Sequence, residues 1–248
     1  MSALRLALRL LAIVAGLLVC LPLHYAWKLV RRPSPWPRRF LGWVGRAAGL
    51  RAQTVGTPLR RDVLFVANHL SWLDIMILAG TTGTAFVSRD DVGRWPVIGW
   101  LAGLNNTVYV DRSNPRAVQD QADTVRAVLA TGQPVALFPE GTTDGGTNVL
   151  PFRASLLSAL FPPLPGLKVQ AVAIDYGAAG AHIAWTGDEA AAANVRRVLS
   201  RKGTAPVTLH FLPPLDPADL GDRKALAQAA REAIVGALGP SARTPDRL

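Results

Sequence analysis

Cysteine is almost absent from this chain of 248 residues, which contains only Cys20. A disulfide within the chain needs two cysteines, and the common zinc sites built from cysteine need several, so the sequence excludes both. A thiol nucleophile is not expected either, because Cys20 lies in an apolar run and a thiol in apolar surroundings stays protonated. The remaining ligand types imply no metal site.

Acidic residues are missing from the first quarter of the chain. Residues 1–61 contain 11 lysines and arginines and no aspartate or glutamate, whereas the remainder holds 16 basic and 17 acidic residues. The net charge of +10 therefore belongs to the N-terminal region. This distribution indicates contact with an anionic surface there. It does not indicate nucleic-acid binding, and no DNA- or RNA-binding motif is present.

Charged residues are also absent from the 18-residue apolar run 10–27, which is just long enough to cross a bilayer as a helix. A cleaved signal peptide is the alternative. It is disfavoured because the run is long for a signal peptide and five cations follow it in place of a small-residue cleavage site. The excess of cations on the C-terminal side predicts that the rest of the chain lies on the cytoplasmic face of the cell membrane.

Aromatic residues and arginines are interleaved in the next segment, 36–46. This pattern is typical of a helix at an anionic lipid interface, and the alternative is an amphipathic helix that packs on the domain. We predict a two-helix membrane anchor over residues 1–55 and one large domain over 56–238. The polar residues 239–248, which include two prolines, are predicted to be a disordered tail.

Strand-like and helix-like segments alternate from residue 62 onward. Such alternation predicts an α/β fold with a mixed, mostly parallel sheet flanked by helices. The expected strands are 62–67, 84–88, 106–110, 134–138, 168–175, 181–185 and 206–212. The expected helices are 71–80, 95–103, 114–131, 152–161, 188–201 and 222–238.

The usual signatures of hydrolases and nucleotide-binding enzymes are missing: there is no Gly-x-Ser-x-Gly, Walker loop, Gly-x-Gly-x-x-Gly or His-Glu-x-x-His. Instead, His69 follows an apolar strand, and Asp74 comes five residues later at the start of a helix. A neutral imidazole is the usual general base near pH 7, and a carboxylate on its other nitrogen stabilises the imidazolium. The alternative is that Ser71 and Asp74 form only a capping box.

Two arginines could bind an anionic ligand at strand ends, where α/β folds tend to place ligands. Arg112 follows the strand expected at 106–110, and its guanidinium offers a fork of donors to an anion. A surface arginine paired with Asp111 is the alternative. Arg153 precedes an apolar helix and is a second candidate cation.

A loop of small residues follows the strand expected at 134–138. Glu140 comes directly after a proline in this loop, and Gly141 and Thr142 follow it. Loops of this composition offer backbone N–H groups and hydroxyls to a polar ligand. A simple strand-to-loop turn would not explain the carboxylate at its start.

Taken together, the segments 68–74, 108–112, 138–142 and 169–174 resemble the four ordered motifs of the glycerolipid acyltransferase family, which includes bacterial 1-acyl-sn-glycerol-3-phosphate acyltransferases. The first resembles the family's His-x4-Asp motif, the second its arginine-bearing motif and the third its Glu-Gly-Thr motif. The resemblance runs from about residue 62 to residue 176. In that order and spacing, the set is far more specific than any single motif.

Two positions depart from the family pattern. Thr143 stands where an arginine commonly follows the Glu-Gly-Thr, and Ala171 stands where the fourth motif usually has proline. The lost arginine bears on phosphate recognition, and Arg153 or Arg89 is a candidate replacement. The segment 140–153 also resembles the lyso-ornithine-lipid branch of the family.

The resemblance implies an O-acyltransferase domain over residues 56–238. It would move a fatty acyl chain from a thioester donor, acyl-CoA or acyl carrier protein, to the hydroxyl of a lysolipid in the membrane. The expected acceptor is 1-acyl-sn-glycerol-3-phosphate, which would give phosphatidate, and lyso-ornithine lipid is the alternative. Remoter alternatives are a lipid-binding module without turnover and a thioesterase that releases the fatty acid to water. No cofactor or metal is implied.

The same resemblance assigns roles to the motif residues. His69 would take the proton from the acceptor hydroxyl as that hydroxyl attacks the thioester carbonyl, and Asp74 would orient the imidazole. Anion-binding side chains, Arg112 first and Arg153 as a replacement, would hold the acceptor's head group. The loop at 140–142 would shape the acceptor pocket.

Overall fold

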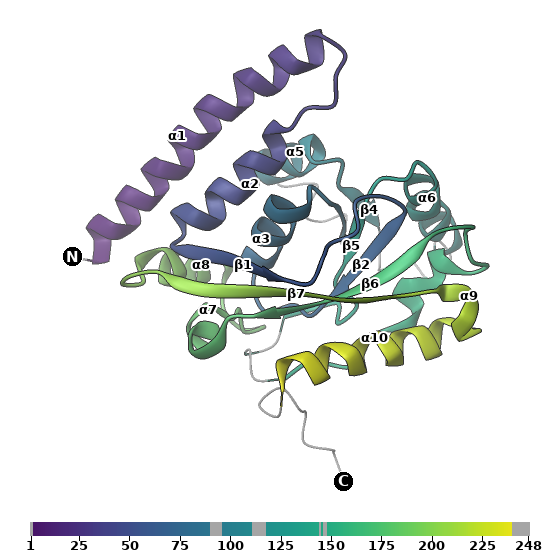
Figure 1. Ribbon diagram of the computed structural model, residues 1–248. Coiled ribbons are helices and arrows are strands. Elements are labelled where there is room, and N and C mark those ends of the chain that lie inside the picture. The colour runs from purple at the N-terminus through teal and green to yellow at the C-terminus, as the bar shows by residue number, and fades with distance from the viewer. Residues whose placement is uncertain (1, 90–95, 111–117, 144, 146–147, 240–248) are drawn as a thin grey trace.

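A computed structural model of the chain describes residues 2–89, 96–110, 118–143, 145 and 148–239 (Figure 1). Within these residues, seven strands form one sheet in the order β1-β7-β6-β2-β5-β3-β4. The strands are β1 (Leu50–Val55), β2 (Val63–Ala67), β3 (Ala85–Arg89), β4 (Val108–Val110), β5 (Val135–Leu137), β6 (Lys168–Asp175) and β7 (Ala205–Leu215). Each neighbouring pair is parallel except β6 with β7, which confirms the predicted mixed, mostly parallel sheet.

Helices cover both faces of this sheet, as Figure 1 shows. The α-helices are α1 (Ser2–Leu29), α2 (Trp36–Ala47), α3 (Leu73–Thr82), α5 (Pro96–Leu104), α6 (Val118–Ala130), α7 (Gly180–Ile183), α8 (Ala191–Ser200), α9 (Pro217–Leu220) and α10 (Arg223–Leu238). Two 3₁₀ helices, η2 (Ala154–Leu160) and η3 (Gly177–Ala179), complete the described elements. The helix expected at 152–161 is therefore the 3₁₀ helix η2.

The central strand β2 is buried along its whole length. Its alternate side chains enter two separate cores: Phe65 packs with residues of α3 and α8, and Leu64 packs with residues of α6 and α10. A parallel sheet covered on both faces needs such continuous apolar strands. The motif turn thus follows directly on a fully buried strand.

The strands that precede the motif segments lie side by side. In the sheet, β2 lies between β5 and β6 and is parallel to both, so the carboxyl ends of all three strands meet at one edge. Asn68, which is buried, fastens this edge: its Nδ2 donates to the carbonyl of Ile174 at 3.1 Å, and its Oδ1 accepts from the N–H of Ile174 at 2.8 Å. The side chain thereby continues the pairing of β2 with β6 beyond the last strand residue.

Residues 50–55, which we predicted to belong to the anchor, form the edge strand β1 and pair with β7. Only Leu50 is buried in this strand, and the other five residues are exposed. A strand with one buried residue lacks the alternation by which strands are recognised in sequence. The sheet therefore begins before the domain boundary that we predicted at residue 56.

The strand expected at 181–185 is wrong, because these residues form the end of α7 and the turn after it. Their backbone groups find partners outside the sheet. Arg197 donates to the carbonyls of His182 at 2.6 Å and Ala184 at 2.7 Å, and the N–H of Trp185 donates to the carbonyl of Leu70 at 2.8 Å. Because these backbone groups already have hydrogen-bond partners, the segment does not have to pair with a strand.

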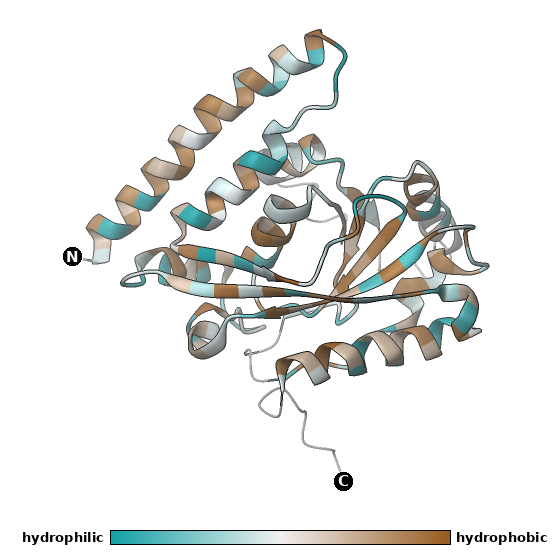
Figure 2. Ribbon diagram, in the orientation of Figure 1, coloured by the Kyte–Doolittle hydropathy of each residue, from teal (hydrophilic) through white to brown (hydrophobic). Residues whose placement is uncertain are grey.

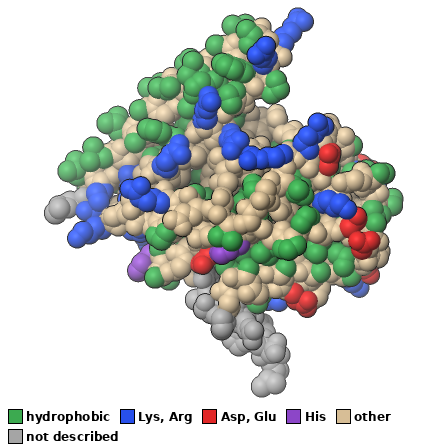
Figure 3. Space-filling view, viewed as in Figure 1, with side chains coloured by type: hydrophobic (Ala, Val, Ile, Leu, Met, Phe, Trp, Pro, Cys, Tyr) green, Lys and Arg blue, Asp and Glu red, His purple; other side chains and the backbone are tan. Residues whose placement is uncertain are grey.

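Helix α1 is long and apolar enough to cross a membrane, and only 11% of its most apolar 18-residue window is buried. Figure 2 shows hydrophobic residues along most of its length, and Figure 3 shows them at the surface. A core helix of a soluble domain would instead be mostly buried. The exposed large apolar side chains of α1 are Leu4, Leu8, Leu10, Leu11, Val14, Leu18, Val19, Leu23, Tyr25, Trp27 and Leu29.

Close contacts hold α1 and α2 on the domain. Trp43 of α2 lies against Gly16 of α1, where an added Cβ would be 2.4 Å from the indole Cδ1. The indole N–H of Trp43 donates to the carbonyl of Ala12 at 2.7 Å. In turn, α2 crosses α3 where Gly42 faces Gly80, so that a Cβ on Gly80 would be 2.5 Å from the Cα of Gly42. Glycines at both crossings let the helices approach closely.

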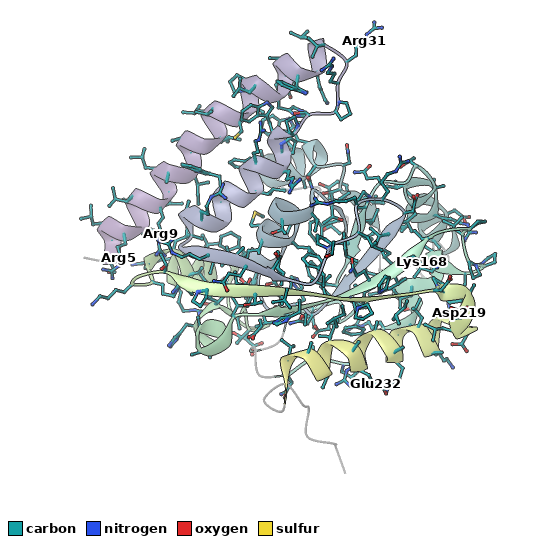
Figure 4. The ribbon with its side chains drawn as sticks, in the orientation of Figure 1. Arg5, Arg9, Arg31, Lys168, Asp219 and Glu232 are labelled. Atoms are coloured by element: carbon teal, nitrogen blue, oxygen red, sulfur yellow. The ribbon has the colours of Figure 1, made fainter. Side chains whose placement is uncertain are left out.

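Some of the N-terminal cations point into the domain. Arg9 donates to the carbonyls of Val198, Leu199 and Gly203, and Arg5 donates to that of Ser200, at the C-terminal end of α8 (Figure 4). Arg38 does the same for Gly80 and Thr81 at the end of α3. These arginines complement the carbonyl ends of two helices. Other lysines and arginines remain at the surface along and beneath α1 in Figure 3.

The predicted tail at 239–248 lies outside the described residues apart from Gly239, which directly follows α10.

Candidate active site

His69 and Asp74 come together at the turn between β2 and α3. The imidazole Nδ1 lies 2.9 Å from the carboxylate Oδ2, and the side chain of Asp74 is fully buried while that of His69 is 18% exposed. An ionised carboxylate only accepts hydrogen bonds, so Nδ1 carries the proton and the lone pair lies on Nε2. Among the described residues, none is hydrogen-bonded to Nε2. The arrangement is that of a general base held in one tautomer.

Asp74 also receives two backbone N–H groups from the same turn. Its Oδ2 accepts from Leu70 at 2.7 Å and from Ser71 at 2.8 Å. The carboxylate lies in the first turn of α3, where the helix dipole favours negative charge. The capping alternative thus describes part of its role, because one carboxylate closes the start of the helix and binds the imidazole.

Two residues that the sequence did not single out complete the surroundings of this pair. The ring of Phe138 stacks on the imidazole of His69, with centroids 4.1 Å apart and planes 12° apart. The hydroxyl of Tyr176 donates to Asp74 Oδ1 at 2.6 Å. Both follow strands that neighbour β2, so only the sheet order could have identified them.

Glu140 lies beside the imidazole, but its carboxylate is turned towards the backbone. Oε1 accepts from the N–H of His69 at 2.8 Å, Oε2 accepts from the N–H of Leu150 at 2.9 Å, and the residue is 3% exposed. The turn that places it ends at Gly141, whose φ of 76° favours glycine and whose N–H donates to Phe138. Glu140 therefore joins the turn that carries His69 to the third motif loop.

The rest of this loop is nearer the surface. Thr142 is exposed, and so is Arg153, whose backbone N–H donates to the carbonyl of Pro139 at 2.9 Å. The loop thus returns to the sheet edge that carries Glu140. Substrate binding by Glu140, Gly141, Thr142 and Arg153 stays a prediction.

Arg112 lies outside the described residues, so its predicted contact with the acceptor stays a prediction. The strand before it, β4, is parallel to β3, and Val110 is in register with Arg89. Both strands therefore end at the edge that carries His69. Residues 108–110, the described part of the arginine motif, therefore lie in a strand that ends at this edge.

A polar network from α8 supports the turn between His69 and Asp74. The indole N–H of Trp72 donates to Oδ1 of Asn194 at 3.1 Å, and Nδ2 of this buried asparagine donates to Glu189 at 2.7 Å. Hydrogen bonds from Arg197 and Asn194 lower the pKa of the Glu189 carboxyl to about 2. The network therefore keeps its charge at every pH at which a neutral imidazole could act.

Comparisons with known proteins agree with this geometry. Residues 51–174 match the family Acyltransferase. The lyso-ornithine lipid O-acyltransferase of Rhodobacter capsulatus is 36% identical over 96% of this chain and 92% of its own, and the 1-acyl-sn-glycerol-3-phosphate acyltransferase of Neisseria gonorrhoeae is 32% identical over 69% of this chain and 68% of its own. The solved 1-acyl-sn-glycerophosphate acyltransferase PlsC of Thermotoga maritima has the same fold, with a TM-score of 0.66 at 22% identity over 96% of both chains. Since family, fold and the His-x4-Asp turn coincide, this chain is a member of the acyltransferase family.

Proposed function

We propose that the protein transfers a fatty acyl chain from a thioester donor to the hydroxyl of a lysolipid, with His69 as general base. The observation that carries this proposal is the imidazole held by a fully buried carboxylate at 2.9 Å, with Nε2 left to accept a proton. The donor is acyl-CoA or acyl carrier protein. Both present the same thioester, so the chemistry at His69 is the same for either.

The reaction needs no covalent enzyme intermediate. Nε2 of His69 removes the proton of the acceptor hydroxyl while the oxygen attacks the thioester carbonyl carbon. The tetrahedral intermediate collapses with cleavage of the C–S bond, and the imidazolium returns its proton to the leaving thiolate. Asp74 stabilises the imidazolium between these steps. A positioned base of this kind contributes about 10²–10⁴ in rate.

Lyso-ornithine lipid is the acceptor that we favour. Support comes from the relative matched along 96% of this chain, which is named for that acceptor, and from Thr143, which replaces the arginine expected for a phosphate. Lyso-phosphatidate, the acceptor expected from the motifs, is the second candidate, because the Neisseria relative is named for it. Arg112 or Arg153 would bind the phosphate of lyso-phosphatidate or the carboxylate of the zwitterionic ornithine head group.

The anchor fits an acceptor that resides in a bilayer. Helix α1 presents an exposed apolar face, and cations lie along and beneath it. The domain would therefore rest on the cytoplasmic face of the membrane, where a lysolipid and a thioester donor are both within reach.

The test is a lipid-product assay with purified protein in vesicles, one thioester donor, and lyso-ornithine lipid and lyso-phosphatidate in competition. We expect acylated ornithine lipid as the main product. His69→Ala should lower transfer by about 10²–10⁴ and leave folding and vesicle binding intact. The matched control is His182→Ala, an exposed histidine on α7, which should transfer at the wild-type rate.

Two results would contradict the proposal. Wild-type-like transfer by His69→Ala would end the assignment of the base. Rapid release of free fatty acid from the donor without any acceptor would identify a thioesterase instead.

A further inference from the structure

Tyr176 is a buried titratable side chain that the mechanism above leaves unused. Only 2% of the residue is exposed, and its hydroxyl donates to Asp74 Oδ1 at 2.6 Å. The other carboxylate oxygen, Oδ2, is the one that binds His69. Tyr176 also lies two residues beyond the segment that matches the family, which ends at residue 174.

Local structure fixes the position of the Tyr176 hydroxyl. Tyr176 follows β6 directly, and β6 is fixed to the end of β2 by the two hydrogen bonds of Asn68. The backbone then turns sharply: Asp175 Oδ1 accepts from the N–H of Gly177 at 2.7 Å, and Gly177 has a φ of 51°. Tyr176 itself has φ −95° and ψ 0°, in the sparsely populated bridge region where many active-site residues are found.

The phenol of Tyr176 stays protonated and can therefore always donate its hydrogen bond to Asp74. Burial, followed by the nearby charge of Asp74 and the hydrogen bond to it, raises the pKa of Tyr176 well above its ordinary value. The hydroxyl therefore keeps its proton at every pH at which the enzyme could work. Because the bond goes to a carboxylate, it is stronger than a bond between neutral groups and withdraws part of the negative charge.

We propose that Tyr176 is a positioning residue for the acyl transfer, one that holds the Asp74 carboxylate so that Oδ2 faces the imidazole and that moderates the charge which His69 experiences. The assignment rests on the proposed function of His69. In this arrangement, Tyr176, Asp74 and His69 form one relay built from β6, α3 and the turn between β2 and α3. In the part of the chain that the structure describes, the one other titratable group bonded to this turn is Glu140, which accepts from the backbone of His69 and is unchanged in the variants below.

The first test is Tyr176→Phe, which removes the donor and keeps the ring. We expect kcat to fall about 10- to 100-fold, as for loss of a hydrogen bond to a charged group, with KM values for donor and acceptor within about twofold. The control is Thr82→Val, which removes a buried hydroxyl at the opposite end of α3, where it donates to Leu78 at 2.7 Å. Thr82→Val should keep kcat.

A second readout separates this proposal from the proposed function, because it needs no turnover. Diethyl pyrocarbonate acylates neutral imidazole, and mass spectrometry of the peptide that contains residue 69 follows its rate against pH. Without the donor, Asp74 keeps more negative charge and stabilises the imidazolium further. The midpoint of the rate should therefore move to higher pH by about half a unit in Tyr176→Phe and stay in place in Thr82→Val.

An unmoved or lowered midpoint in folded Tyr176→Phe would overturn the proposal, whether or not the protein transfers acyl chains. If Tyr176→Phe does not fold, 3-fluorotyrosine at position 176 gives the same decision. Its more acidic phenol donates more strongly, so the midpoint should move to lower pH. If the midpoint of the 3-fluorotyrosine protein equals that of the wild-type protein, the proposal is wrong.

Discussion

The carboxylate of Asp74 accepts hydrogen bonds from four described groups: the imidazole of His69, the backbone of Leu70 and Ser71, and the hydroxyl of Tyr176. A fully buried charge is tolerated only when it is satisfied in this way. The same bonds decide the direction of the imidazole, because the carboxylate cannot rotate without breaking several of them. Burial and orientation of the base are thus one structural feature.

Glu140 supports the turn from the other side, and its removal is the sharpest test at this scale. In Glu140→Gln, one oxygen becomes an amide that faces a backbone N–H, so one of the bonds to His69 and Leu150 is lost. We expect the free energy of unfolding to fall by about 1–3 kcal/mol and kcat to fall with it. Thermal unfolding and the lipid-product assay measure the two effects.

The control for this change is Glu232→Gln. Glu232 is an exposed residue of α10 and bonds only Gln228 among the described side chains (Figure 4). If Glu140→Gln matched this surface variant in both stability and kcat, the supporting role of Glu140 would be wrong.

At the scale of elements, α3 links the anchor to the chemistry. Its first turn carries Asp74, and its last turn is crossed by α2 at Gly80 and bonded by Arg38. A second anchor arginine, Arg9, holds the end of α8, whose Asn194 contacts the indole of Trp72. Both helices that support the turn between His69 and Asp74 are therefore bonded at their far ends by arginines of α1 and α2.

Gly80→Ala tests the first of these connections. The new Cβ would lie 2.5 Å from the Cα and 2.7 Å from the N of Gly42, and backbone atoms within a helix cannot easily give way. We expect a loss of about 1–3 kcal/mol in the free energy of unfolding, together with slower transfer because α3 tilts. Chemical denaturation monitored by tryptophan fluorescence measures the stability.

Gly236→Ala in α10 is the matched control, since a Cβ there meets nothing within 4 Å. An exposed helical glycine is less favourable than alanine by about 0.5–1 kcal/mol, so this variant should be slightly more stable. Equal stability changes in the two variants would contradict the close crossing of α2 and α3.

At the scale of the whole molecule, the anchor is a layer added to the outside of an α/β domain. Helix α1 packs on α2 and α8 through one side, and its other side carries exposed leucines (Figures 1 and 2). A soluble monomer rarely exposes so large a contiguous apolar surface. The surface lies next to cations, which favours an anionic bilayer.

Leu11→Asp combined with Leu18→Asp tests this face. The two leucines are 65% and 68% exposed and seven residues apart, and therefore lie on one side of the helix. We expect binding to vesicles that contain anionic lipid to weaken at least about tenfold, because two large apolar contacts are lost. Co-sedimentation measures the change.

Val55→Asp, on the exposed edge of β1, introduces a charge at a 53% exposed apolar residue outside the anchor and should leave vesicle binding unchanged. Undiminished sedimentation of the Leu11 and Leu18 variant would show that this face does not contact lipid.

The sequence by itself determined the features that local patterns encode. The uninterrupted apolar run predicted the helix α1, and the alternation of strand-like and helix-like segments predicted the α/β domain. His69 and Asp74, which are five residues apart, meet across a single turn. The alternation of strands and helices was sufficient to predict the fold class, and the order of the four motifs was sufficient to predict the acyltransferase family. The edge strand β1 was missed because only Leu50 of it is buried, so it lacks an alternating pattern, and the short segment 181–185 was mistaken for a strand.

Only the tertiary structure decided which distant groups meet at the site. Tyr176 is 102 residues from Asp74 in sequence, and Glu140 is 71 residues from His69, yet parallel neighbouring strands bring their ends to one edge. It likewise decided that Arg9 and Arg38 bond carbonyls at the ends of helices. The physical reason is that strand order depends on how the apolar surface of the whole chain is buried. A local sequence pattern reflects only residues that are close along the chain.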